Sequence, residues 1–279
     1  MGLKNKIKNI IPDKIYLKLV YKKRLGKKLN LKDPKTFNEK LQWLKLYDRN
    51  PKYTALVDKY EVKKYIEKQI GKQYVIPTLG VYDKFDEIDF DKLPNQFVIK
   101  CTHDSGGLVI CKDKSKLNIE ESRDKIENCL NTNYYYQGRE WPYKNVKPRI
   151  IIEKYMEDNK GCLFDYKFMC FNGEAKLSFV CTDRDKKDLK VTFFDKEWNK
   201  MPFERHYKSS NEKIDRPKQY ELMIQLAEKL SKDIPFVRVD FYEVDNQIYF
   251  GELTFYPGCG FEEFEPEEWD EKLGEFIKI

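Results

Sequence analysis

The spacing of apolar residues divides the chain into a helical beginning and a strand-rich remainder. Between Thr36 and Tyr47, apolar residues recur every three or four positions, and Thr36 with Glu39 forms the Thr-x-x-Glu pattern of a helix capping box. A further helix is predicted over residues 53–70, directly before a glycine. We therefore expect residues 1–70 to be mostly helical.

Beyond residue 71, short runs rich in β-branched and aromatic residues are separated by turn residues. These runs predict strands at residues 74–82, 96–102, 108–112, 149–156, 165–171, 174–182, 190–195, 236–244 and 247–255. Further helices are predicted at residues 119–132, at residues 217–232 and after Pro266. Asn172-Gly173 and Asp245-Asn246 separate strand runs as hairpin turns do. The expected fold class is α+β.

Composition indicates a folded protein of a reducing compartment. Hydrophobic residues make up 41% of the chain and aromatic residues 15%, which excludes a disordered chain. No apolar run reaches the roughly 18 residues of a membrane span, and the N-terminus lacks an apolar signal core. The seven cysteines form no Cys-x-x-Cys pair, so we expect buried thiols rather than zinc ligands or disulfides. These features predict a cytoplasmic location.

Positive charge is concentrated at the N-terminal end. Residues 1–35 contain twelve Lys or Arg against Asp13 and Asp33, a balance of +10 within a chain of net charge +6. Such a segment is either a solvated helical face or a docking site for an anionic membrane surface or polymer. Nucleic acid is not expected as a partner, because no nucleic-acid module follows the segment.

A lysine-bearing strand followed by a polar glycine turn suggests a phosphate-binding loop. Lys100 lies in the run QFVIKCT, and Asp104-Ser105-Gly106-Gly107 separates it from the run LVICK. Backbone N–H groups of such a turn can bind phosphate oxygens, while the lysine supplies charge. The same sequence also serves as a simple turn, and it is neither a Walker A loop nor a Rossmann glycine motif.

Two carboxylates are predicted to meet on the last hairpin. Arg238 and Asp240 lie on one strand, Glu252 and Thr254 on the next, and pairing these strands would bring Asp240 beside Glu252. A divalent cation relieves such repulsion, and Mg²⁺ typically uses one or two carboxylates together with nucleotide phosphates. The alternative is that both carboxylates face solvent on an edge hairpin.

A charged pair, Glu153-Lys154, interrupts the apolar run RIIIEKYM near its end. A buried strand that turns into a connector can present backbone N–H and C=O groups, to which the edge of an adenine ring can bond. An ordinary strand end would have the same sequence.

Together and in this order, the segments resemble the ATP-grasp superfamily, in particular the TupA-like ATP-grasp proteins of teichuronopeptide and surface-polysaccharide biosynthesis. The matching segments are FNEKLQWLKLY, DKYEVKKYI, IPTLGVY, FVIKCTHDSGG, DYKFMCFNGE, VRVDFY and GELTFYPG. The resemblance implies an ATP-grasp fold of two α+β lobes that grip ATP. The N-terminal lobe would be residues 71–148, with the phosphate loop, and the C-terminal lobe residues 149–279, with the metal site and the last helix. The helical, basic residues 1–70 would be an extension.

The resemblance also implies which residues bind ATP: two lysines for the phosphates, a loop that closes over them, a hinge for adenine, and two residues near the ribose and phosphates. The phosphate lysines are Lys59 and Lys100, and the closing loop is Asp104, Ser105, Gly106 and Gly107. The adenine hinge is Glu153, Lys154 and Met156, and the residues near the ribose and phosphates are Asp165 and Lys167.

The metal and catalytic roles follow from the same resemblance. Asp240 and Glu252 correspond to ligands of Mg²⁺. The third ligand is normally an asparagine two residues after the glutamate, and Thr254 stands in its place, which leaves its metal role open. Arg238 and the backbone N–H of Gly258 correspond to the pair that stabilises a tetrahedral intermediate, and Lys100 corresponds to a catalytic charge beside the phosphates.

The expected function is ATP-dependent joining of a carboxylate to an amine through an acylphosphate. The resemblance implies a uronic-acid-type sugar or glycan as the carboxylate, an amine or amino acid as the second substrate, and a role in capsule or cell-wall polysaccharide assembly. Three alternatives stay open. One is a phosphotransferase acting on a sugar hydroxyl, one a glycosyltransferase for which the Asp183-Arg184-Asp185 triplet is weak support, and one an inactive ATP-binding module.

Overall fold

The computed structural model describes residues 10–157, 164–182 and 188–279. Three features noted in the sequence lie outside these ranges: Cys162, the Asp183-Arg184-Asp185 triplet, and the first three lysines of the basic segment. The other six cysteines form no disulfide. Within the described ranges, no helix is both long enough and apolar enough to cross a membrane.

Contacts between residues divide the chain into two compact units. Unit 1 consists of residues 1–49 and 163–279, and unit 2 of residues 50–162. The lobe boundaries at residues 70 and 148 that the resemblance implies do not coincide with these units. Among the N-terminal helices, those before residue 50 belong to unit 1, where they pack with the C-terminal part of the chain. Those after residue 50 belong to unit 2.

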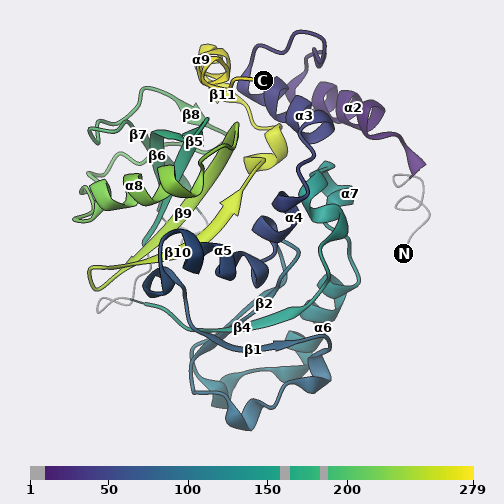
Figure 1. The fold of residues 1–279 in the computed structure, drawn as a ribbon, viewed down its shortest axis with the longest axis vertical. Coiled ribbons are helices and arrows are strands. Elements are labelled where there is room, and N and C mark those ends of the chain that lie inside the picture. Colours follow the sequence, from purple (N-terminus) through teal and green to yellow (C-terminus); the bar gives the residue numbers. More distant parts are fainter. Residues whose placement is uncertain (1–9, 158–163, 183–187) are drawn as a thin grey trace. The chain divides into compact units, whose positions relative to one another are not determined.

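Unit 2 is built on a four-stranded antiparallel sheet in the order β1-β4-β2-β3. Its strands are β1 Thr78–Tyr82, β2 Phe97–Cys101, β3 Leu108–Cys111 and β4 Ile150–Lys154. Its helices are α4 Lys52–Val57, α5 Glu61–Gln69, α6 Ile119–Leu130 and α7 Tyr135–Gly138, with 3₁₀ turns at Lys72–Tyr74, Phe85–Glu87, Phe90–Lys92, Lys114–Lys116 and Trp141–Asn145. The sheet and α6 are drawn in the lower part of Figure 1.

Strand alternation gives this sheet one buried apolar face and a second face that carries both charged and apolar side chains. Phe97, Ile99 and Cys101 of β2 are buried together with Ile152 of β4, and Ile126 of α6 packs into the same core. The residues between them point to the opposite face, because successive side chains of a strand alternate. Lys100 and Glu153 lie on that second face.

The prediction of one helix over residues 53–70 is wrong. The structure has two helices there, α4 and α5, separated by residues 58–60. The Asp58 carboxylate accepts hydrogen bonds from the N–H groups of Tyr60 and Glu61, at 2.8 and 3.1 Å, and so caps α5. Its other oxygen accepts from Arg149 at 2.7 Å. Asp58 therefore starts a new helix where apolar periodicity alone predicts a continuous one.

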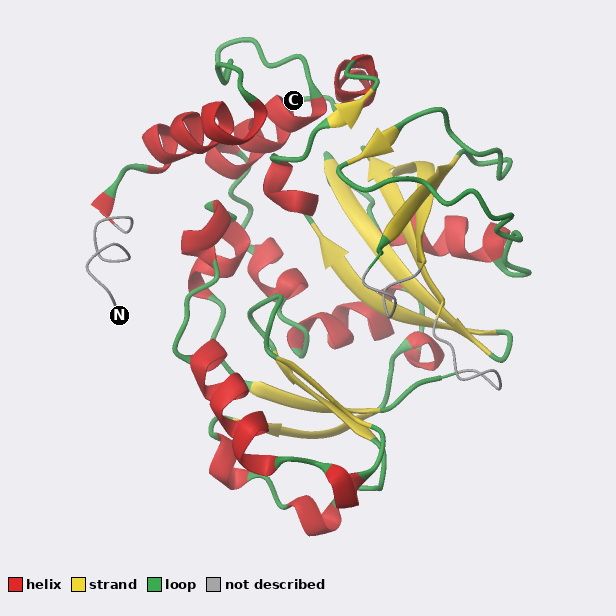
Figure 2. Ribbon diagram, turned by 180° about the vertical axis from the view of Figure 1, so that it is seen from behind, coloured by secondary structure: helices red, strands yellow, loops and turns green. Residues whose placement is uncertain are grey.

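Unit 1 is built on a five-stranded antiparallel sheet in the order β10-β9-β5-β6-β7. Its strands are β5 Phe164–Phe171, β6 Glu174–Thr182, β7 Lys190–Phe194, β9 Phe236–Val244 and β10 Gln247–Thr254; β8 Glu204–Arg205 pairs with β11 Phe264–Glu265. Its helices are α2 Asp13–Leu25, α3 Phe37–Tyr47, α8 Tyr220–Leu230 and α9 Glu268–Phe276, with a 3₁₀ turn at Pro257–Gly260. Figure 2 shows the long strands of this sheet in yellow, and α8 covers one of its faces.

Both predicted hairpin turns are confirmed. Asn172 and Gly173 have φ values of 50° and 86°, and Asp245 and Asn246 have φ values of 50° and 63°. Two consecutive positive φ angles are the requirement of the type I′ turn that suits the twist of paired strands.

Helix α3 begins as predicted and is anchored to the C-terminal part of unit 1. The Thr36 side chain accepts from the Glu39 N–H at 3.2 Å, and the capping box is complete. The Asn38 N–H donates to the Asp270 carboxylate at 2.9 Å, and the Asn38 amide donates to the Glu262 carbonyl at 2.8 Å. Helix α3 is therefore part of the unit that carries the last hairpin.

Candidate active site

The predicted site residues form two groups, one within each unit. Lys59, Lys100, the 104–107 turn and the 153–156 hinge belong to unit 2. The remaining residues, from Asp165 to Gly258, belong to unit 1.

In unit 2, the structure brings Lys59 together with the glycine turn. Lys59 lies in the break between α4 and α5; its N–H donates to the Thr102 carbonyl at 3.0 Å and its ammonium donates to the Asp104 carbonyl. The Asp104 carboxylate is buried and accepts from the Gly107 N–H at 2.7 Å, so it shapes the turn from inside. Ser105 and Gly106 are exposed at the tip.

Gly107 is required by close packing in this turn. A Cβ atom at this position would lie 2.7 Å from the Cys101 sulfur and 3.0 Å from the Asp104 carboxylate. Only glycine lets the chain return this closely to β2, as expected where a backbone must pass a neighbour at short range.

The second face of the unit 2 sheet carries a buried carboxylate between two ammonium groups. One Glu153 oxygen accepts from Lys100 at 2.6 Å, and the other forms an ion pair with Lys63, which also donates to the Ile76 carbonyl at 2.7 Å. Burial alone would raise the pKa of Glu153, but Coulombic attraction to Lys100 and Lys63 outweighs it and lowers that pKa. Burial lowers the pKa of Lys63. Glu153 thus holds Lys100 in place on β2.

The end of β4 is less open than the sequence suggests. The Lys154 N–H donates to the Pro77 carbonyl at 3.0 Å, so this amide is already bonded. The Lys154 side chain is exposed and Met156 is buried. Met156 can therefore offer adenine only an apolar surface. The Glu153 carboxylate points toward Lys63 and Lys100.

In unit 1, Arg238 joins two carboxylates on the sheet face opposite α8. Its guanidinium donates to both oxygens of Asp240 at 2.7 Å and to Glu252 at 2.5 Å. The Thr254 hydroxyl donates to the same Glu252 oxygen at 2.9 Å. The expected convergence of Asp240 and Glu252 is present, and a guanidinium lies between them.

Lys167 completes this cluster from the neighbouring strand. It lies opposite Asp240 in the β5–β9 pairing, forms an ion pair with that carboxylate, and contacts Asp165 at 2.7 Å. Burial would lower the pKa of Lys167, but attraction to Asp240 raises it. Burial raises the pKa of Asp240, while Arg238 and Lys167 oppose that shift. The cluster is therefore a buried carboxylate held between two cations.

A β-bulge aligns Glu252 with this cluster. Phe250 pairs with Phe241 and Leu253 pairs with Val239, so two residues of β10, Gly251 and Glu252, face the single residue Asp240. A Cβ atom at Gly251 would lie 3.2 Å from the Asp240 carbonyl, so a side chain there would crowd β9. Bulges commonly redirect a side chain beside a site in this way.

Gly258 lies in a left-handed turn after β10. Gly258, Cys259 and Gly260 have φ values of 58°, 54° and 61°. Gly258 is exposed, and a Cβ atom there would collide with the Glu262 carboxylate. Both the backbone angle and the space therefore require glycine at position 258.

Comparison with known protein families decides how this arrangement is classified. A sequence profile described as TupA-like ATPgrasp matches residues 39–278. The chain belongs to the TupA-like ATP-grasp family. A sequence search of curated proteins found no match.

Solved structures similar to this TupA-like ATP-grasp protein include two D-alanine–D-alanine ligases. The ligase of Bacillus anthracis, solved with ATP, is 17% identical with a TM-score of 0.42, over 72% of this chain and 54% of that one. The Helicobacter pylori ligase is 15% identical with a TM-score of 0.46, over 86% and 69%. A biotin carboxylase of Campylobacter jejuni is 14% identical with a TM-score of 0.45, over 80% and 47%. The chain thus spans about half to two thirds of these proteins.

The donor chemistry of the unit 1 cluster fits the Mg²⁺ ion that the ATP-grasp family implies. Mg²⁺ is a hard cation that binds oxygen, commonly through one or two carboxylates and nucleotide phosphates. Asp240, Glu252 and Thr254 supply two carboxylates and a hydroxyl on one sheet face. In the described part of the chain, no group of three or more His, Cys, Asp or Glu residues could hold a metal ion.

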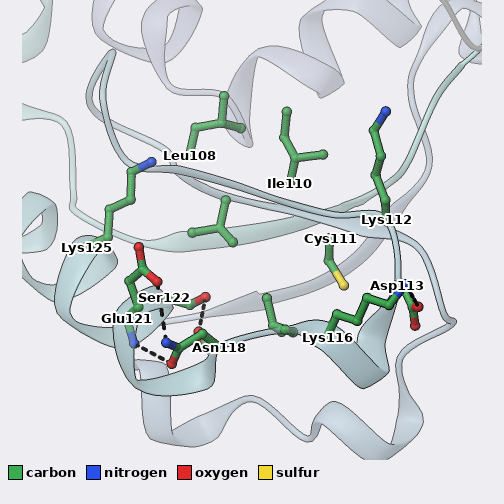
Figure 3. Close-up of a pocket in the computed structure, with 12 residues that line it drawn as sticks. Leu108, Ile110, Cys111, Lys112, Asp113, Lys116, Asn118, Glu121, Ser122 and Lys125 are labelled. Carbon is green, nitrogen blue, oxygen red and sulfur yellow. Dashed lines mark hydrogen bonds and ion pairs between the residues drawn. The ribbon is translucent and has the colours of Figure 1, made fainter.

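A hollow of about 680 Å³ lies between β3 and the start of α6. Figure 3 shows Cys111, Asn118, Glu121 and Ser122 on one side of β3, with Leu108 and Ile110 projecting on the other. None of the predicted site residues lines this hollow. The exposed side chains of Leu108 and Ile110 share the second sheet face with Lys100, because Leu108 pairs with Lys100.

His103 is a structural residue by its contacts. It is buried, and its Nε2 lies 3.1 and 3.2 Å from the carbonyl oxygens of Cys129 and Thr132. Since both partners are acceptors, we assign the proton to Nε2. These hydrogen bonds explain why a histidine lies beside the glycine turn without a catalytic role for His103.

Several buried or half-buried residues that were not predicted from the sequence hold these groups in place. They include Lys63 on α5, Asp58 at the helix break and Arg149 before β4. The sequence did offer a signal for two of them. Asp58 and Lys63 lie in the matching segment DKYEVKKYI, one residue before and four residues after Lys59. Only the tertiary structure, however, shows which carboxylate each cation meets.

We predict that replacing Glu153 by Gln destabilises the protein by roughly 3–5 kcal/mol at pH 7, because it leaves Lys63 and Lys100 without their buried counter-charge. The lowered pKa of Glu153 means that its stabilisation is complete above the carboxyl's ordinary pKa and disappears as pH falls through the lowered value. The stability gap between wild type and Glu153→Gln should therefore close in acid.

Urea unfolding at several pH values measures this gap. Glu120→Gln is the matched control, since Glu120 is exposed on α6 and contacts neither lysine. A gap no larger than that of the control, or one that widens toward acid pH, would contradict the prediction.

Proposed function

We propose that this protein is a Mg-ATP-dependent ligase that joins a carboxylate to an amine through an acylphosphate. The observation that carries this proposal is the Arg238 cluster, in which a half-buried guanidinium contacts two carboxylates on the hairpin that precedes a left-handed glycine turn. Family membership supports ATP as the energy source. All six described thiols are buried or half-buried and none forms a disulfide, which suits the cytoplasm, where ATP is available.

In the proposed reaction, an oxygen of the acceptor carboxylate attacks the γ-phosphorus of ATP, and the bond from that phosphorus to the ADP oxygen breaks. The amine nitrogen then attacks the carbonyl carbon, phosphate leaves with the bonding electrons, and the nitrogen loses a proton. The products are an amide, ADP and phosphate. Activation is necessary because a carboxylate anion resists attack by an amine.

The roles of the chain's own residues follow from charge. Lys59 and Lys100 would neutralise the phosphates, and Ser105 and Gly106 at the exposed tip would close over them and exclude water. Arg238 and the Gly258 N–H would stabilise the oxyanion that develops on the carbonyl oxygen. Asp240 and Glu252, with Thr254 beside them, would hold Mg²⁺, which when bound neutralises charge on the transferred phosphoryl group.

The proposed substrates are a uronic-acid-type sugar or glycan and an amine or amino acid, as in polysaccharide assembly. The support is the family match to TupA-like proteins. Screening uronic-acid-containing glycans against an amine library tests this, with ADP release and product mass as readouts. A ligase needs the amine for full turnover and gains the mass of the amine less one water, whereas a phosphotransferase needs no amine and gains a phosphoryl group.

We predict that a carboxyl-¹⁸O acceptor transfers one ¹⁸O atom to inorganic phosphate during turnover, because the carboxylate oxygen that attacks phosphorus leaves with it. The measurement is the mass of the released phosphate, and a reaction without acceptor is the control. Label in AMP would indicate adenylation, and amide product without label in phosphate would exclude an acylphosphate; either result overturns the mechanism.

A further inference from the structure

We propose that helix α2 is a docking surface for an anionic lipid bilayer. Its docking face consists of Ile15, Lys18, Leu19 and Lys22. The last three lie three, four and seven positions after Ile15, so all four share one side of the helix. Ile15 is 52% exposed and Leu19 is 60% exposed. Large apolar side chains that are exposed together on one side of a helix indicate an interaction surface.

The opposite side of α2 is already occupied by the core of unit 1. Tyr16, Leu17 and Tyr21 are buried, and the ring of Tyr21 packs edge-on against Phe261 at 6.4 Å. The orientation of the helix is therefore fixed, and the docking face is left outward. Ile10, just before the helix, is 80% exposed and continues the apolar surface.

The charge of the docking face suits an anionic surface. Asp13 is the sole acid in the α2 sequence, and it forms an ion pair with Arg49 at 2.9 Å. Lys14 and Lys23 are exposed beside the docking face. Anionic lipids attract such clusters of lysine.

The apolar residues favour a bilayer over a soluble polyanion. A polymer of negative charge would pair with the lysines and leave Ile15 and Leu19 in water. At a membrane interface, a helix places its apolar side chains among the acyl chains while its lysines contact the headgroups. The docking face presents both kinds of side chain together.

Vesicle sedimentation tests this proposal with two double variants. Ile15→Asn with Leu19→Asn removes the apolar contact and keeps the charge, and should lower partitioning onto phosphatidylglycerol-containing vesicles at least tenfold. Lys18→Glu with Lys22→Glu should lower it by more than about 25-fold, since each lysine near the surface contributes about fivefold. Ile119→Asn on α6, where the isoleucine is 40% exposed, is the matched control and should bind like wild type.

Purely zwitterionic vesicles and soluble polyglutamate distinguish the partners. The proposal expects weak binding to both. It is overturned if wild type does not sediment with anionic vesicles, or if the Asn pair binds them as well as wild type does. Binding to polyglutamate that depends on the lysines but not on Ile15 and Leu19 would identify a polymer as the partner and also overturn it.

A second inference concerns the segment FNEKLQWLKLY, to which the proposed function assigns no role. We infer that side chains of α3 and β8 are positioning residues for the Gly258 N–H; this inference rests on the proposed function of that group. Gln42 and Lys45 of α3 are fully buried, and both reach the left-handed turn. Their bonds end on carbonyl oxygens of the turn.

Three carbonyls of the turn are held by buried donors. Lys45 donates to the Cys259 carbonyl at 2.7 Å and Gln42 to the Gly260 carbonyl at 2.7 Å. Arg205 donates to the Pro257 carbonyl at 2.7 Å. Lys45 also lies over the Phe261 ring, 4.6 Å from its centroid.

The planar peptide bond converts the Arg205 contact into an orientation of the Gly258 amide. The Pro257 carbonyl and the Gly258 N–H belong to one peptide unit and point in opposite directions. Holding the carbonyl toward Arg205 therefore aims the N–H away from it. Among the residues that the structure describes, none accepts a hydrogen bond from the Gly258 N–H, so this donor is available to a ligand.

Substitutions that remove these donors should lower kcat and leave the KM for ATP unchanged. We expect a loss of about a hundredfold for Arg205→Met, since one misplaced oxyanion donor costs on the order of 10²–10³ in rate. Lys45→Met should lose about tenfold, and Lys45→Arg should restore part of this loss. Lys40→Met is the matched control: Lys40 lies on the same helix and donates to the Ile277 carbonyl, outside the turn, at 2.8 Å.

Amide hydrogen exchange at residues 259–261, whose N–H groups are held within the turn, is the second readout and requires no catalysis. It should accelerate in Arg205→Met and Lys45→Met but not in Lys40→Met. If wild type has no ligase turnover, the proposed function fails while exchange still tests the positioning. The inference is overturned if exchange in the turn is the same in Arg205→Met and Lys45→Met as in wild type. It is also overturned if folded Lys45→Met loses no more kcat than Lys40→Met. Gln42→Met replaces any variant that does not fold.

Discussion

Buried charge on the sheet faces is the constraint on which the rest of the structure depends. Removing a carboxylate or an ammonium from water costs several kcal/mol unless a counter-charge lies within hydrogen-bonding distance. Each unit meets this requirement with a cluster of alternating sign. In unit 2, Glu153 lies between Lys63 and Lys100. In unit 1, Asp240 lies between Arg238 and Lys167.

Strand register and helix breaks follow from that constraint. The pairing of β5 with β9 sets Lys167 opposite Asp240, and the bulge in β10 brings Glu252 to the same guanidinium. The break at Asp58 places Lys59 at the glycine turn. Charges that could bind phosphates are thus ordered by the protein itself before any ligand arrives, and preorganised charge is what stabilises developing oxyanions.

Much of this architecture could be predicted because it depends on local patterns. Runs rich in β-branched and aromatic residues predicted the strands, and the Thr36–Glu39 pair predicted the start of α3. Residues such as Lys63, Lys45 and Arg205 could not be given a role from sequence alone. Each acts on a group distant in the chain, as Lys45 does on Cys259, and neither charge nor periodicity encodes that partner. The break at residues 58–60 was missed because a capping aspartate inside an apolar repeat competes with the repeat.

We propose that Glu252 and its neighbours form the catalytic metal site. Turnover of wild type and Glu252→Gln across a magnesium titration tests it most directly, with Glu243→Gln as control because Glu243 lies on the same hairpin outside the cluster. The account predicts that Glu252→Gln lowers maximal turnover on the order of a hundredfold or more and requires higher Mg²⁺, while Glu243→Gln behaves like wild type. Equal activity of Glu252→Gln and wild type at every Mg²⁺ concentration would contradict it.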